Sequence, residues 1–281
     1  MKKSLLTIII ILVFLVGLGI MLYPLVSDYI NAQNQSRAIA RYYEDIEDIS
    51  LEDYAAAIEL AHQYNQTLMG KPNRYVLTDE EHAEYMNLLN LSSNGVMGVL
   101  EIDVIGVSLP IYHGTEESAL QIGVGHFEGT SLPVGGLGTH AVLTGHTGLP
   151  RSTLLTDLDQ VVVGDTFRVR VLNETLTYEI DQIAIVLPHE TDELEIRRDQ
   201  DYCTIVTCTP YGVNSHRRMV RGTRIANEEV PETEEIIRRV VNPVEVNNIG
   251  PIIAGAVLVG FAGIGTITWL VIKMIGKKPR K

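Results

Sequence analysis

The chain has 281 residues, of which 46% are hydrophobic and 20% are charged, so it is long enough for one substantial core with additional segments. The formal net charge is −13, but seven of the 22 Lys and Arg residues lie at the two ends, where no Asp or Glu occurs. The segment between the ends therefore carries 15 basic and 35 acidic residues, a net charge of −20. So acidic a surface argues against nucleic acid as a partner. It suits either solubility alone or a basic, amine-bearing partner.

An apolar run without any charge extends from Leu5 to Leu25 and follows Lys2 and Lys3. About 20 apolar residues are needed to cross a bilayer core of roughly 30 Å. A cleaved signal peptide, the alternative, has an apolar stretch of about 7–15 residues and a small-x-small cleavage site. The length therefore predicts an uncleaved membrane anchor in residues 1–27, with a short cytoplasmic end.

A second uncharged run extends from Ile249 to Ile272 and is followed by five basic residues. A buried core helix is the alternative, but the length and the basic end favour a membrane span within residues 249–281. Lys and Arg collect on the cytoplasmic side of spans. The sequence thus predicts a protein of the cell membrane with two transmembrane helices, both termini cytoplasmic and the segment between the two helices extracellular.

Residues 28–94 are predicted to form a helical extension. Asp28 to Gly70 has helical character, and Ser50-Leu51-Glu52-Asp53 is typical of a helix start. Thr78-Asp79-Glu80-Glu81 begins another short helix that is expected to end near Asn90. At the other end of the chain, residues 228–248 are acidic, contain two prolines and are predicted to be a linker.

Residues 95–227 have β character. A hairpin is predicted from Gly98 to Tyr112, turning at Gly106. Further strands are expected at His140–Thr144, Thr166–Leu172, Leu176–Val186, Tyr202–Cys208 and Met219–Ile225. Many short strands at this spacing predict a mainly β domain that is either a closed barrel or a sandwich.

Two cysteines, Cys203 and Cys208, lie in one β-branched run. An offset of five residues places them on opposite faces of a strand, with Cα atoms roughly 16 Å apart. A disulfide requires a separation below about 7 Å, so two free thiols are expected. Cys208 ends the strand just before Pro210 and Gly212, which would leave its thiol at the rim of a sheet. It is a candidate nucleophile, with a buried structural cysteine as the alternative.

A nucleophilic thiol needs nearby positive charge or a base. Arg217 belongs to a basic segment that returns beside Cys208 and could stabilise an oxyanion; a solvated strand edge is the alternative. His146 follows a short strand in a Gly-flanked turn, where it could serve as a base or as a simple turn residue. His216 is the rival base, but strand alternation turns it away from Cys208 if Arg217 faces it.

No cofactor and no metal are predicted. The chain has no C-x-x-C, H-x-x-H or H-E-x-x-H spacing. It also has no phosphate-cradling glycine loop after a strand.

These residues resemble the sortase family. Thr204-Ile205-Val206-Thr207-Cys208 is similar to its T-[L/I]-x-T-C signature, Arg217 stands nine residues later, and Thr144-Gly145-His146 resembles its T-G-H segment. The resemblance runs from about Gly95 to Ile225. Cys208-Thr209-Pro210-Tyr211-Gly212-Val213-Asn214, the helical extension and the second span resemble class C, pilin-assembling members. Many of these carry a lid with an Asp-Pro-aromatic motif, whereas none of the 11 prolines here follows Asp.

The resemblance implies an eight-stranded β-barrel with an N-terminal helical extension and a transmembrane helix at each end. It also implies a cysteine transpeptidase acting on secreted pilin or surface proteins with a C-terminal LPxTG-like sorting signal. Cys208 would attack the Thr–Gly carbonyl, Arg217 would stabilise the oxyanion, and His146 would serve as acid and base. The amine acceptor would be a pilin lysine. The alternatives are a housekeeping-type enzyme with a peptidoglycan acceptor, a hydrolytic cysteine protease and a non-catalytic membrane-tethered scaffold.

Overall fold

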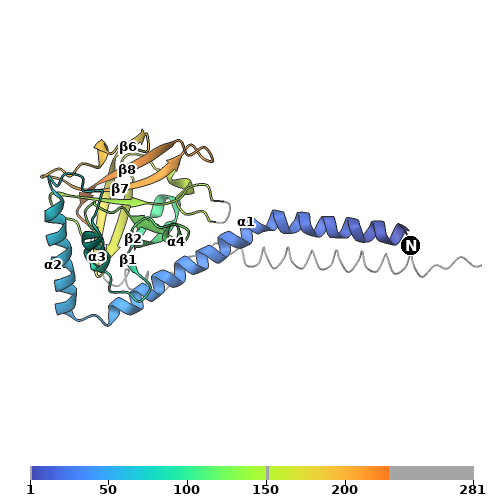
Figure 1. The fold of residues 1–281 in the computed structure, drawn as a ribbon, viewed down its shortest axis with the longest axis horizontal. Helices are drawn as coiled ribbons and strands as arrows, with labels where there is room; N and C mark the ends of the chain where they lie inside the picture. The colour runs from blue at the N-terminus through green and yellow to red at the C-terminus, as the bar shows by residue number, and fades with distance from the viewer. Residues whose placement is uncertain (1, 150–151, 228–281) are drawn as a thin grey trace, which may run out of the picture.

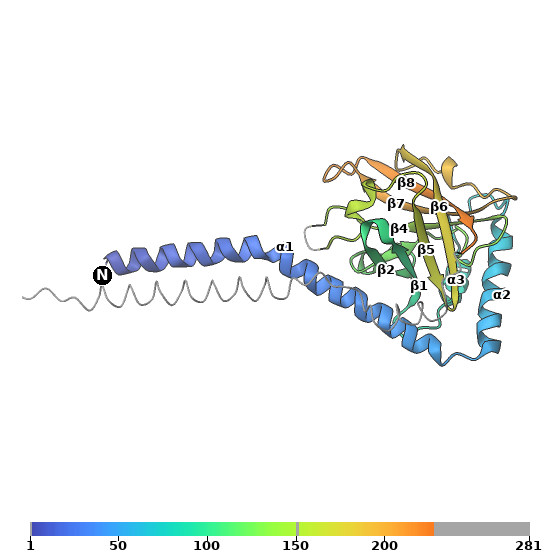
Figure 2. The same ribbon diagram turned by 180° about the vertical axis from the view of Figure 1, so that it is seen from behind.

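The computed structural model describes residues 2–149 and 152–227. The predicted acidic linker at 228–248 and the predicted second span at 249–281 lie outside the described residues. The described part contains a long N-terminal helix, two further helices that precede the barrel, and one β-barrel with short helices in its connections (Figures 1 and 2).

Helix α1 (Lys2–Glu47) joins the apolar run to the barrel without a break. Within the described residues it is the one helix that is long and apolar enough to cross a membrane. Pro24 lies inside it, at the end of the apolar run, and proline lacks the amide that a helix interior needs. Beyond a bend the helix passes along the barrel, while its apolar half projects away from the domain (Figure 1).

The predicted helical extension from Asp28 to Gly70 consists of the end of α1 and a second helix, which starts where the sequence predicts a helix start at Ser50. Helix α1 ends at Glu47, and α2 (Leu51–Leu68) begins after Ser50, whose side chain accepts a hydrogen bond from the Asp53 amide. This N-cap explains the break, because a capping residue has non-helical dihedrals and starts a new helix. Helix α3 (Asp79–Asn87) has the capping box predicted at Thr78 and ends three residues before the expected position.

The prediction of a closed eight-stranded barrel is confirmed. Its strands lie in the order β1-β2-β3-β4-β7-β8-β6-β5. They are β1 (Val96–Ile102), β2 (Val107–His113), β3 (Val124–His126), β4 (Thr139–Thr144), β5 (Thr166–Val171), β6 (Glu174–Val186), β7 (Asp201–Thr209) and β8 (His216–Ile225). Short helices connect them at α4 (Glu117–Leu120), η1 (Asp103–Ile105), η2 (Thr156–Asp159) and η3 (Asp192–Leu194).

Strand alternation separates two apolar clusters on the two faces of the barrel wall. Cys203 and Ile205 of β7 point into the main core. Their neighbour Val206 belongs to a smaller cluster with Met219 of β8 and Val142 of β4. Helix η3 contributes Leu194 to this second cluster. Even-numbered residues of β4 and β7 therefore face the outside of the barrel, where the smaller cluster lies.

The buried hydroxyls of two tyrosines fasten the helical extension to the barrel. Tyr42 of α1 donates to the Met97 carbonyl at 3.2 Å and accepts from the Leu172 amide at 2.6 Å. Tyr85 of α3 bonds to Nδ1 of His126 at 2.9 Å. Buried polar groups of this kind are costly to leave unpaired, so each tyrosine fixes one position of its helix.

Candidate active site

Three neighbouring strands, β4, β7 and β8, end or begin at one rim of the barrel. Cys208 of β7 lies directly opposite Arg217 of β8 in their antiparallel ladder. Directly opposed residues share a face, and their Cβ atoms are about 4.5–5.5 Å apart. This is the juxtaposition of thiol and cation that strand alternation predicts.

His146 reaches the same rim from β4. In the parallel pairing of β4 with β7, Thr144 is level with Val206, and the Gly145 amide donates to the Val206 carbonyl at 3.1 Å. Two residues past the Thr144–Val206 pair, just beyond the end of β4, the same alignment brings His146 level with Cys208.

Gly145 indicates the face on which His146 lies. A Cβ added there would meet Leu155 Cδ1 at 2.8 Å and Val124 Cγ1 at 3.0 Å, both from core residues, so position 145 faces inward. His146 therefore points outward, as Cys208 does. The three predicted site residues thus lie on the outer face at the ends of three adjacent strands, with Cys208 in β7, Arg217 in β8 and His146 two residues after the end of β4.

Glu117 of α4 is an unpredicted member of this site. The Nε2–H of His146 donates to Glu117 Oε2 at 3.2 Å, and the two side chains are 27% and 64% exposed. Helix α4 has only four residues and follows β2, so no sequence pattern connects it with the segment after β4. A carboxylate in this position fixes which imidazole nitrogen carries the proton.

Arg217 is held by the backbone of the turn that it follows. Its Nη1 donates to the Asn214 carbonyl at 3.2 Å and to the His216 carbonyl at 3.1 Å. His216 lies opposite Thr209 and is bonded to the Ser215 hydroxyl at 2.9 Å. His216 therefore lies on the opposite face of β8 from Arg217, and this alternative base points away from Cys208.

Both cysteines are free, as predicted, but their surroundings differ. Cys203 is fully buried in the core, and burial raises the pKa of its thiol. Cys208 is half-buried at the end of β7. Of the two, only Cys208 lies where a substrate could reach it.

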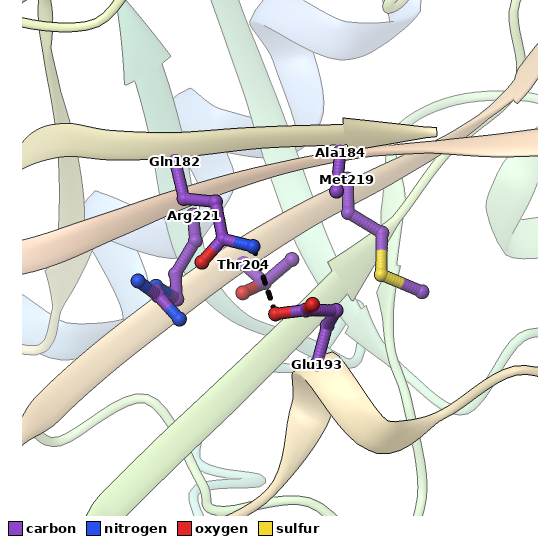
Figure 3. Close-up of a pocket in the computed structure, with 6 residues that line it drawn as sticks. All are labelled: Gln182, Ala184, Glu193, Thr204, Met219 and Arg221. Atoms are coloured by element: carbon purple, nitrogen blue, oxygen red, sulfur yellow. Dashed lines mark hydrogen bonds between the residues drawn. The ribbon is translucent and has the colours of Figure 1, made fainter. Parts of the chain in front are cut away.

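A small pocket lies further along the outer face that carries Cys208 (Figure 3). Thr204 of β7, Met219 and Arg221 of β8, Gln182 and Ala184 of β6, and Glu193 of η3 line it. Two of these residues are bonded to each other, since Gln182 donates to Glu193 at 2.8 Å. Thr204 is four residues before Cys208, about 13 Å along an extended strand.

The stretch Gly70–Tyr75 packs at the η3 end of this face. Arg74 is buried and donates to the Leu194 carbonyl at 2.8 Å. The Tyr75 ring lies 5.5 Å from that of Phe127. Among the described residues, none of its hydrogen bonds reaches Cys208, His146 or Arg217.

Comparison with known proteins agrees with this geometry. Residues 100–225 match the family model described as Sortase domain. Sortase C1 of Streptococcus agalactiae is 44% identical, with 68% of this chain and 100% of that chain covered and a TM-score of 0.65. Sortase C of Streptococcus pneumoniae is 40% identical, with 68% and 97% covered and a TM-score of 0.62.

A more distant relative is sortase D of Bacillus subtilis, 30% identical over 131 residues. That match covers 46% of this chain and 63% of the relative's length. The match to the family model begins within β1 and ends with β8, so it spans the barrel that carries Cys208, His146 and Arg217. The chain belongs to the sortase family.

Proposed function

We propose that the protein is a membrane-anchored cysteine transpeptidase that cleaves an LPxTG-like sorting signal between Thr and Gly and joins the acyl group to a lysine amine of a pilin subunit. The observation that carries this proposal is the direct pairing of Cys208 with Arg217, with His146 at the adjoining end of β4. The S. pneumoniae sortase C, at 40% identity, is described in connection with pilin substrate specificity.

In the first half-reaction, the Cys208 thiolate attacks the threonyl carbonyl carbon, and Arg217 stabilises the oxyanion that develops. The C–N bond to glycine breaks, and His146 gives a proton to the leaving amine. The product is a thioester on Cys208. Because Nε2 of His146 is turned to Glu117, Nδ1 is the nitrogen left to exchange protons with the substrate.

In the second half-reaction, the ε-amine of a lysine gives a proton to His146 and attacks the thioester carbonyl. The C–S bond breaks, the thiolate is regenerated, and an isopeptide bond joins two subunits.

The same proposal includes membrane anchoring. The uncharged run from Leu5 to Leu25 is about 31 Å long as a helix, which is enough to cross a bilayer core. Its most apolar part is not buried against the barrel. We infer that this half of α1 spans the membrane with Lys2 and Lys3 in the cytoplasm and the barrel outside. The second span and the cytoplasmic C-terminus remain part of this proposal.

Intact-mass analysis of the full chain with an LPxTG-type peptide tests the chemistry. We expect an acyl adduct in the wild type and in Cys203→Ala, and none in Cys208→Ala. Cys203→Ala is the matched control because it removes the buried thiol on the other face. An adduct that persists without Cys208 would contradict the assignment, and a stable Cys208→Ala variant that remains fully active would favour the scaffold alternative.

The acceptor is tested by adding amines to the preformed adduct. Transfer to a lysine-bearing pilin peptide in preference to a peptidoglycan stem peptide supports pilus polymerisation. The reverse preference would identify a housekeeping-type enzyme. Transfer to water alone would identify a protease.

A further inference from the structure

The apolar half of α1 ends beside the rim that carries the candidate site. Asp28 comes three residues after Leu25, and its Oδ1 accepts hydrogen bonds from the Thr153 amide at 2.8 Å and the Thr153 hydroxyl at 3.0 Å. The segment after β4 and the β7–β8 loop both lie on the side of the barrel from which the apolar half of α1 projects (Figures 1 and 2).

Helix geometry places this contact relative to the bilayer; this step rests on the proposed membrane anchoring. Three residues beyond Leu25 correspond to about 5 Å along the helix axis. The polar headgroup layer extends about 5–7 Å on each side of the hydrocarbon core. Asp28, and Thr153 with it, therefore lies at the level of the headgroups.

Short contacts connect Thr153 to the catalytic rim. The Leu155 amide, two residues further on, donates to the His146 carbonyl at 3.2 Å. Gly148 lies against the Tyr211 ring of the β7–β8 loop, since a Cβ added at Gly148 would stand 2.9 Å from Tyr211 Cε2. Tyr211 is nevertheless 67% exposed and Val213 is 68% exposed. The loop tip thus presents two apolar side chains on the rim that faces the headgroups.

The charge of this rim differs from that of the rest of the domain. The segment between the two ends of the chain carries a net charge of −20, yet residues 143–156 and 202–226 contain no Asp or Glu. The β7–β8 loop leads instead into Arg217 and Arg218. Two nearby carboxylates, Asp28 and Glu117, are bonded to Thr153 and His146, and the remaining ones, Glu116, Asp157 and Asp159, lie on the neighbouring helices α4 and η2 rather than on the loop. An uncharged loop that leads into two arginines is complementary to an anionic lipid surface.

We propose that the tip of the β7–β8 loop, Tyr211 and Val213, docks on the headgroup region of the bilayer beside α1. Tyrosine is enriched at this depth because its ring is apolar and its hydroxyl is polar. Docking at this point holds Cys208 and His146 at the membrane surface, so the thioester forms there rather than away from the bilayer. A second contact besides α1 also limits rotation of the domain about its anchor.

Lipid-resident quenching tests the docking in the full chain. A fluorophore is attached to Val213→Cys in a Cys208→Ala background, where the remaining Cys203 is fully buried. The protein is reconstituted in phosphatidylglycerol–phosphatidylcholine vesicles that contain brominated lipid. The matched control is Leu137→Cys, which is 78% exposed and precedes β4 at the end opposite His146. A third label at Val16→Cys, in the apolar half of α1, reports the anchor itself.

We expect the Val213 label to be quenched at least threefold more than the Leu137 label. Equal, weak quenching of these two labels with strong quenching at Val16 would overturn the docking and leave the proposed anchoring intact. An unquenched Val16 label would contradict both the proposed membrane anchoring and the docking. It would not bear on the Cys208 chemistry, which the intact-mass experiment tests separately. A Val213 label that responds only to added sorting-signal peptide would overturn the proposal in favour of a peptide contact.

Discussion

At the scale of single residues, the orientation of the His146 ring depends on Glu117. The 3.2 Å contact joins two partly exposed side chains, so its energy is modest. Its effect on catalysis comes from selecting one tautomer and one ring orientation rather than from stabilising the fold. A residue that acts in this way alters turnover more than substrate binding.

We therefore expect Glu117→Gln to lower kcat about 3- to 10-fold, the effect of about 0.7–1.4 kcal/mol, which is the range for one hydrogen bond. KM should change less than twofold, and Glu117→Asp should restore part of the loss. Steady-state transpeptidation with the peptide and a lysine acceptor measures both constants. Glu116→Gln, which removes the neighbouring charge, is the control. Equal losses in the two glutamine variants would contradict a specific role for Glu117.

At the scale of elements, the strands with apolar, β-branched runs were predictable from sequence, whereas β3 was not. Strand β3 has only three residues, Val-Gly-His, and its existence depends on pairing with β2 and β4 rather than on its own pattern. The alternation that turns Arg217 toward Cys208 was predictable, because successive side chains along any strand point to opposite faces. The contact of Glu117 with His146 was not, since it joins residues 29 positions apart through loop geometry.

The docking of α1 on the barrel also depends on a contact that sequence does not reveal. Tyr42 is fully buried, and its hydroxyl bridges Met97 in β1 and Leu172 in the turn before β6. Burial and the neighbouring tyrosines raise the pKa of this hydroxyl, so it stays neutral at physiological pH. It can then donate one hydrogen bond and accept another.

We expect Tyr42→Phe to lower the free energy of unfolding by about 1–3 kcal/mol, because the Leu172 amide loses its acceptor in a buried place. Urea denaturation of the full chain in detergent measures the change. Tyr43→Phe provides a neighbouring control on the same helix, at a partly buried side chain that packs on the core. A loss in Tyr43→Phe as large as that in Tyr42→Phe would show that the buried bridge is not the cause.

At the scale of the whole molecule, buried histidines couple the barrel's stability to pH. His126 and His140 are almost completely buried, and desolvation lowers the pKa of each from 6.5 to about 4. His126 bonds to Tyr85 and to the Ser131 carbonyl, and His140 to Thr204 and the Glu195 carbonyl. The two rings thus join α3 and the segment after η3 to the barrel.

The sign of the pH dependence follows from these pKa values. The unfolded chain protonates these histidines near pH 6.5, whereas the folded protein resists protonation until about pH 4. The unfolded state therefore binds more protons in between, and stability falls as the pH falls through this window. Each ring contributes a loss of about 3 kcal/mol by pH 4. Buried Asp201, whose pKa is raised by desolvation, acts in the opposite direction as it protonates.

Urea midpoints between pH 7.5 and 4.5 test this coupling, because the lower limit lies above the ordinary pKa of exposed carboxyls. We expect the urea midpoint to fall steadily below pH 6.5, and to fall less steeply in His126→Gln, which keeps a polar side chain but cannot take up the proton. The rest of the slope comes from His140 and from buried His113, whose pKa is also lowered by desolvation. His189→Gln, at an exposed position, should keep the wild-type slope. An unchanged slope in His126→Gln would place the pH dependence elsewhere in the barrel. The coupling also reaches the outer face that carries Cys208, because Thr204, the partner of His140, lines the pocket on that face.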